Sequence, residues 1–197
     1  MGKQLVVMVS GSGSNLQALL DHDALGGQIT RVVADRPAAG GLDRARARAV
    51  EAVAVAPADH PDRATWEVAL TAAVAEAEPD LVVLAGFMRI LSPPFVRRWP
   101  ILNVHPSLLP AFPGARAVTD ALAWGVRVSG ATVHFVDEQV DHGPIVAQEA
   151  VAVTPEDTPA SLHERIQAVE HRLLPECVAL FCHDRLAVDG RHVRILP

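Results

Sequence analysis

Short apolar runs rich in β-branched residues alternate with longer amphipathic segments through the first half of the chain. The runs predict strands at 4–10, 29–34, 52–56, 80–85 and 101–105. The intervening segments predict helices at 14–22, 41–50, 62–77 and 92–98, and the last begins at Ser92 with two prolines in its first turn. This alternation is typical of a parallel sheet flanked by helices.

The pattern changes after Gly114. A short helix is expected at 115–125, followed by strands at 128–136 and 144–153 that a short polar loop, 137–143, would join as an antiparallel pair. A long amphipathic helix at about 158–182 and a hairpin turning at Asp189-Gly190 complete the chain. We therefore predict an α/β fold with a Rossmann-like open twisted sheet, mostly parallel, an antiparallel C-terminal extension, and helices on both faces.

The length and composition fit one globular domain spanning residues 1–197, and no linker or internal repeat divides the chain. The net charge of -6 disfavours binding to a nucleic acid backbone. The first apolar run, Leu5 to Val9, is too short for a signal peptide, and no run of about 20 apolar residues follows. We therefore expect a cytoplasmic protein that binds neither nucleic acid nor membrane.

The cysteine and histidine spacings do not predict a metal site. Cys177 and Cys182 lie in a helical pattern and are expected to be buried free thiols, because no CxxC or mixed Cys/His spacing surrounds them. The nine histidines form no HxH or HExxH pattern. We accordingly expect no metal.

A glycine loop follows the first strand. Gly11 and Gly13 come directly before a helix that starts at Ser14 or Asn15, and such a loop can bring a phosphate close to backbone N–H groups. A tight strand-to-helix turn would also explain the glycines. So would a dinucleotide fold, in which Asp35 would be the ribose-binding acid, although the third glycine of that motif is absent.

A polar pair ends the fifth predicted strand. Asn103 and His105 are two positions apart, so their side chains project to the same face at the carboxyl end of the strand, where open α/β sheets bind ligands. Such an Asn can donate to a developing oxyanion while the His carries a proton. A capping Asn beside a structural His is the alternative for this pair taken alone.

Two residues of the second half bear on this pair. Asp141, in the loop 137–143, is interpreted as a carboxylate that favours a protonated neighbouring imidazole, the alternative being a turn-forming Asp. His134 shares a strand face with Thr132 and is predicted to be a buried histidine whose hydrogen bonds are satisfied within the sheet. The combination of Asn, His and Asp favours catalysis over a structural role.

Four segments, taken in order, resemble a known family. They are GSGSNLQALL, LAGFMRIL, LNVHPSLLP and DHGP, and together they make the chain similar, nearly end to end, to the phosphoribosylglycinamide formyltransferases of purine synthesis. The resemblance implies formyl transfer from 10-formyltetrahydrofolate to the glycine amine of 5'-phosphoribosylglycinamide. It also implies that residues 1–100 are the phosphate- and nucleotide-binding half and that 101–197 are the catalytic and folate-binding half.

The resemblance also implies roles for individual residues. The catalytic set would be Asn103, His105 and Asp141, and the ribonucleotide would contact Gly13, Ser14, Asn15 and Glu170. The folate would contact Arg63, Met88, Arg89, Ile90, Leu91, Asn103, Val140 and Asp141.

Two positions depart from the family pattern. Arg116 stands where many members carry histidine, and His142 replaces a small residue beside the catalytic Asp. A formyltetrahydrofolate deformylase is the main alternative, and a nicotinamide-dependent oxidoreductase is a weaker one. The protein is expected to be a monomer or a homodimer, and the sequence does not decide between them.

Overall fold

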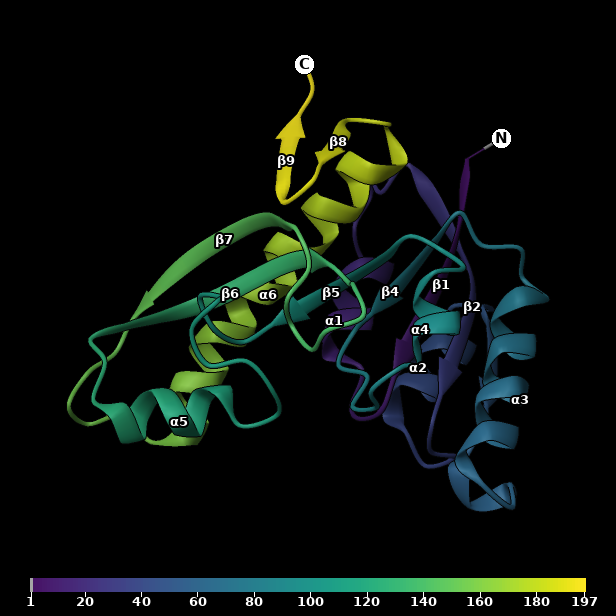
Figure 1. The fold of residues 1–197 in the computed structure, drawn as a ribbon, viewed down its shortest axis with the longest axis horizontal. Coiled ribbons are helices and arrows are strands. Elements are labelled where there is room, and N and C mark those ends of the chain that lie inside the picture. Colours follow the sequence, from purple (N-terminus) through teal and green to yellow (C-terminus); the bar gives the residue numbers. More distant parts are fainter. Residues whose placement is uncertain (1) are drawn as a thin grey trace. The chain divides into compact units, whose positions relative to one another are not determined.

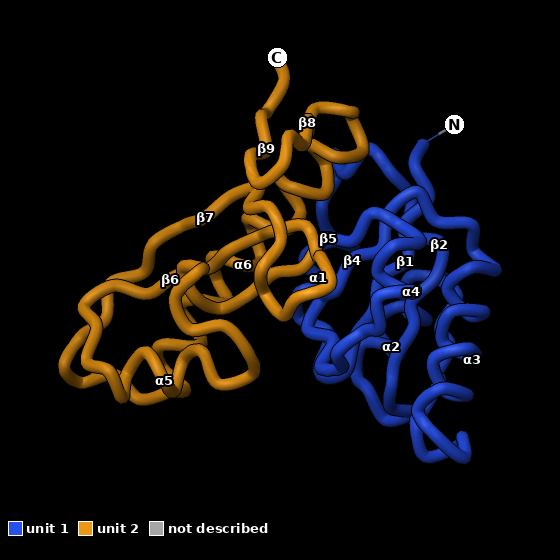
Figure 2. The backbone as a smooth tube through the Cα atoms, in the orientation of Figure 1, with its two compact units in different colours: residues 1–102 blue, residues 103–197 orange. Residues whose placement is uncertain are grey.

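The protein is described here from a computed structural model that covers residues 2–197. The chain forms two compact units, residues 1–102 and 103–197, coloured separately in Figure 2. Strand β5 (Ile101–His105) crosses the boundary between them. That the two halves act as one formyltransferase domain stays a prediction.

The first unit contains a parallel sheet. Its strands are β1 (Lys3–Val9), β2 (Gly27–Ala34), β3 (Glu51–Ala54) and β4 (Leu81–Leu84), and their order is β3-β2-β1-β4 (Figure 1). Residues 5–9 of the central strand β1 are fully buried, as an apolar run flanked by strands on both sides requires. The strand order therefore reverses at β1.

Helices connect these strands. They are α1 (Ser14–Leu20), α2 (Gly40–Ala47), the 3-10 turn η1 (Pro57–Asp59), α3 (Arg63–Ala75) and α4 (Pro93–Val96). Because parallel crossovers are right-handed, the reversal at β1 puts α1 and α2 on one face of the sheet and α3 on the other. The loops that follow β1 and β4 consequently meet, and the Met88 amide donates to Ser10 Oγ at 2.8 Å. Such a switch point is where open α/β sheets bind ligands.

The second unit is built around an antiparallel pair. Strands β6 (Val128–Phe135) and β7 (Ile145–Ala152) pair in register from Val128 opposite Ala152, with an irregularity between Val133 and His134. Helix α6 (Pro159–Cys182) packs on both strands, and α5 (Ala117–Trp124) precedes them in the chain. Strands β8 (Leu186–Asp189) and β9 (His192–Ile195) form the terminal hairpin, and β9 joins β7 in parallel at Ile145 opposite His192.

The predicted α/β class, with parallel strands first and an antiparallel C-terminal extension, is confirmed. Two details differ. Helix α4 is a single turn, Pro93–Val96, and the two residues that turn the terminal hairpin are Gly190 and Arg191 because Asp189 still pairs with His192. The cysteines are free and buried as expected, and over residues 2–197 no helix has the length and apolarity to cross a membrane.

Candidate functional site

The carboxyl end of β5 carries two of the predicted site residues. Asn103 and His105 are two positions apart on this strand, so their side chains lie on a common face. His105 is 5% exposed and Asn103 is half-buried. His105 Nε2 lies 2.8 Å from the carbonyl oxygen of Phe112. Because a carbonyl only accepts hydrogen bonds, Nε2 carries a proton, and the ring is fixed by the loop that follows its own strand.

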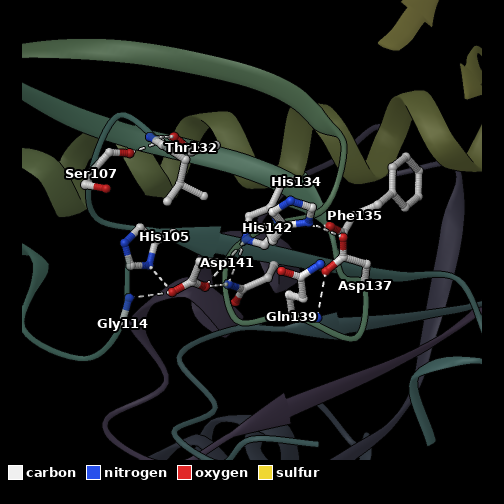
Figure 3. A network of polar contacts seen from close by, with 12 residues as sticks. His105, Ser107, Gly114, Thr132, His134, Phe135, Asp137, Gln139, Asp141 and His142 are labelled. Atoms are coloured by element: carbon white, nitrogen blue, oxygen red, sulfur yellow. Dashed lines mark hydrogen bonds and ion pairs between the residues drawn. The ribbon is translucent and has the colours of Figure 1, made fainter. Parts of the chain in front are cut away.

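That loop, residues 106–114, is pinned to β6 by Thr132. The Thr132 hydroxyl donates to the Ser107 carbonyl at 2.6 Å and accepts from the Leu109 amide at 3.1 Å (Figure 3). Gln148 on β7 also donates to this hydroxyl at 2.9 Å. The loop that fixes His105 is therefore tied by side chains to both long strands of the unit.

Asp141 supplies the carboxylate. Its Oδ2 accepts from the Gly114 amide at 2.7 Å and lies 3.4 Å from His105 Nδ1. Figure 3 shows the carboxylate facing both groups. The predicted approach of Asp141 to His105 is thus present in the geometry. Oxygen acceptors therefore lie beside both ring nitrogens of His105.

Asn103 is oriented by two partners. Its Nδ2 lies 3.2 Å from His134 Nε2 and 3.5 Å from Asp141 Oδ1. His134 Nδ1 lies 2.8 Å from the Phe135 carbonyl and must donate to it, so a neutral ring accepts at Nε2. Burial lowers the pKa of His134 below its ordinary value, which keeps the ring neutral and able to accept.

His134 is therefore the residue whose place in the site the sequence did not reveal. It is buried and its hydrogen bonds are satisfied within the sheet, as predicted, and one of its partners is the candidate catalytic amide of Asn103 on β5. Strand alternation identified its face, and only the pairing of strands 31 residues apart in sequence could identify that partner.

The loop that bears Asp141 has contacts of its own. His142 Nδ1 lies 2.7 Å from Asp137 Oδ2, and the other oxygen of Asp137 accepts from the Gln139 amide at 2.9 Å. Burial alone would raise the pKa of Asp137, but the hydrogen bonds from His142 and Gln139 outweigh it, so the pKa is lowered. Arg116, the other departure from the family pattern, pairs with Asp120 at 2.7 Å on the surface of α5.

In the first unit, the glycine loop leads into α1 as predicted. Gly13 is the N-cap with φ of 75°, and a Cβ there would lie 2.5 Å from Gly41 Cα at the start of α2. A Cβ on Gly11 would meet nothing within 4 Å. Gly13 is therefore required by the packing of the turn, whereas Gly11 leaves open space above the loop.

The loop after β4 is held by three side chains of the same unit. Arg63 donates to the Ile90 carbonyl at 2.8 Å, Ser10 accepts from the Met88 amide, and Asp35 pairs with Arg89 at 2.6 Å. Arg63 and the predicted folate-binding stretch 88–91 are thus neighbours. The Asp35 carboxylate, which the dinucleotide alternative assigned to a ribose, is buried, and its Oδ2 is paired with Arg89.

The remaining predicted binding residues differ in exposure. Met88, Ile90 and Val140 are large apolar side chains left half or more exposed, while Leu91 is buried. Asn15 is buried in α1 and Glu170 in α6. In the part of the chain described, 2–197, no three His, Cys, Asp or Glu side chains lie close enough to share a metal ion.

Comparison with known proteins gives consistent results. Residues 3–178 match the formyl transferase family. The phosphoribosylglycinamide formyltransferase of Mycobacterium tuberculosis is 52% identical over 95% of this chain and 89% of that protein. The human trifunctional purine biosynthetic protein adenosine-3 is 43% identical over 90% of this chain, which spans 18% of its length.

A solved structure agrees with these relatives over the whole chain. Glycinamide ribonucleotide transformylase 1 from Symbiobacterium toebii superposes with a TM-score of 0.95 at 47% identity, covering 100% of this chain and 95% of the other.

Proposed function

The chain belongs to the phosphoribosylglycinamide formyltransferase family, and we propose that it transfers the formyl group of 10-formyltetrahydrofolate to the glycine amine of 5'-phosphoribosylglycinamide. The products are the N-formyl ribonucleotide and tetrahydrofolate, a step of de novo purine synthesis. The observation that carries this proposal is the cluster of Asn103, His105 and Asp141 in the second unit. Free thiols at both cysteines agree with a place in the reducing cytoplasm.

Asn103 is assigned to the oxygen of the formyl group. Attack by the amine on the formyl carbon makes a tetrahedral centre whose oxygen gains negative charge and needs a donor. The Nδ2 contact to Asp141 is long, at 3.5 Å, and so is easily exchanged for such an oxygen. His134 would retain the other Nδ2 proton and keep the amide turned toward the substrate.

His105 is assigned to the proton transfers. In the overall step a carbon–nitrogen bond forms to the amine, the bond to N10 of the folate breaks, the amine loses one proton and N10 gains one. The imidazole contacts differ in length, 2.8 Å at Nε2 and 3.4 Å at Nδ1, so we assign the proton that moves to the looser Nδ1 side. Asp141 would face the ring on that side, at 3.4 Å.

Substrate binding is assigned by the family resemblance. The loop Gly13 to Asn15 would hold the ribose phosphate with backbone N–H groups, and Glu170 would contact the nucleotide. The exposed apolar side chains of Met88, Ile90 and Val140, together with the backbone of residues 88–91, would contact the pterin, with Arg63 near the folate. Small molecules, not a nucleic acid, are the expected partners.

The deciding experiment measures tetrahydrofolate and formylated ribonucleotide together. We expect no formyl loss from the folate until the ribonucleotide is added, and then one product for each folate consumed, because a bound amine has a high effective concentration beside the formyl group. Tetrahydrofolate release without the ribonucleotide would identify a deformylase instead. Removal of His105 should lower whichever activity is found about 10²-fold or more.

A further inference from the structure

The terminal hairpin reaches the loop that bears Asp141. Arg191, in the two-residue turn between β8 and β9, donates from Nη2 to the His142 carbonyl oxygen at 2.8 Å. Its Nη1 lies 3.2 Å from His142 Nε2. The pairing of Ile145 with His192 sets the hairpin beside this loop, so the contact follows from the strand arrangement.

The carbonyl that Arg191 holds belongs to the peptide between His142 and Gly143, one residue beyond Asp141. Asp141 has φ of 51°, a left-handed conformation that costs a non-glycine residue about 1 kcal/mol or more. Two residues on, Gly143 lies so close to β6 that a Cβ would sit 1.9 Å from the Phe135 carbonyl oxygen. The direction of the Asp141 carboxylate is therefore set by a backbone that needs external support.

His142 adds a second tie to the same arrangement. Its ring lies between the Asp137 carboxylate, at 2.7 Å, and the Arg191 guanidinium. The charge of Arg191 also acts on Asp137. The hairpin, His142 and Asp137 thus form one connected group.

We propose that Arg191 is a positioning residue that holds the backbone beside Asp141, and thereby aims its carboxylate at the Gly114 amide and His105. The inference rests on the proposed function for its kinetic consequence, but its structural consequence can be measured without any substrate. Arg194, exposed on the same hairpin, is the matched control because Arg194→Met makes the same chemical change, the loss of one guanidinium, at a different position.

The structural arm follows amide hydrogen exchange by NMR. Arg191→Met should speed exchange of the Gly114 amide about tenfold, since that amide is protected by its bond to the Asp141 carboxylate. Arg194→Met should leave it as in the wild type, and unchanged exchange in α6 shows that Arg191→Met folds. Wild-type protection of Gly114 in Arg191→Met would overturn the proposal whatever the enzyme's activity.

The kinetic arm is a double-mutant cycle with Asp141→Asn. We expect Arg191→Met to lower kcat about tenfold in the wild type, with KM for the ribonucleotide nearly unchanged, and to have no further effect once Asp141 is replaced. Arg191→Lys, which keeps one donor, should restore part of kcat. A tenfold loss of equal size in both backgrounds would show that Arg191 acts independently of Asp141 and would refute the assignment.

Discussion

At the scale of single residues, the candidate site is a chain of fixed hydrogen-bond roles. The Phe135 carbonyl forces His134 to donate from Nδ1, so its neutral ring accepts from Asn103, and the Asn103 amide then presents Nδ2 rather than its oxygen. The Phe112 carbonyl fixes His105 in the same way. Main-chain oxygens therefore decide the orientation of both candidate catalytic groups.

The first prediction follows from these roles. Asn103→Ala and His105→Ala should each lower turnover about 10²-fold or more, because one oxyanion donor or one proton carrier is typically worth that much. Steady-state kinetics with both substrates is the measurement. His163→Ala, an exposed histidine of α6, is the control and should keep wild-type turnover.

At the scale of elements, the glycine loop has two different glycines. Gly13 lies against the backbone of Gly41, and Gly41 in turn packs on the Val9 side chain so closely that a Cβ on Gly41 would be 2.8 Å from Val9 Cγ2. The Gly41 amide also donates to the Gly11 carbonyl at 3.2 Å. Only Gly11 has free space where a side chain would project.

The second prediction separates packing from binding. Gly13→Ala should lower the free energy of unfolding by about 1–2 kcal/mol or more, from its positive φ and its contact with Gly41. Gly11→Ala should keep wild-type stability but raise KM for the ribonucleotide about tenfold, with little change in KM for the folate. Urea unfolding and kinetics on both variants are the measurements. Equal KM changes for the two substrates in Gly11→Ala would show that this loop does not bind the ribose phosphate.

At the scale of the whole molecule, buried ionisable groups link stability to pH. Burial lowers the folded-state pKa of His134 below its ordinary 6.5, so on acidification the unfolded chain takes up that proton first. His134 therefore contributes stability that is present above about pH 6.5 and lost as the pH falls through its folded pKa. Asp157, with a pKa lowered to about 2 chiefly by its bond from the Thr154 amide, loses its contribution only below about pH 4.

The third prediction uses the fact that His134 and Asp157 affect stability in different pH ranges. Between pH 7 and 5, the wild type should lose stability with a His134 contribution of up to about 1.4 kcal/mol per pH unit. His134→Gln, which removes the titrating group, should flatten the profile in this window although it is less stable at pH 7. Urea unfolding at a series of pH values is the measurement. His163→Gln should leave the slope unchanged, and an equal slope in His134→Gln would mean that other groups carry the effect.

The sequence by itself determined the elements and the shared face of Asn103 and His105. These depend on spacing along the chain: a period near 3.6 for helices and two for strands, with glycine and proline ending them. The carboxyl end of β5 could be identified as a site because its strand, its two polar residues and the prolines that end it are contiguous. The polar loop 137–143 made Asp141 a candidate partner, and the family motifs added its place in the catalytic set.

Only the tertiary structure decided the contacts between distant segments. His134 meets Asn103, Asp35 meets Arg89, Gly13 meets Gly41, and Arg191 meets His142. Each pair joins elements whose adjacency comes from strand order and packing, and no periodicity in one segment encodes its neighbour in another. A polar group's role depends on which partner burial gives it, because a buried donor or acceptor must be satisfied where it lies. Asp35 therefore looked like a ribose ligand in the sequence and is, in the folded chain, the partner of Arg89.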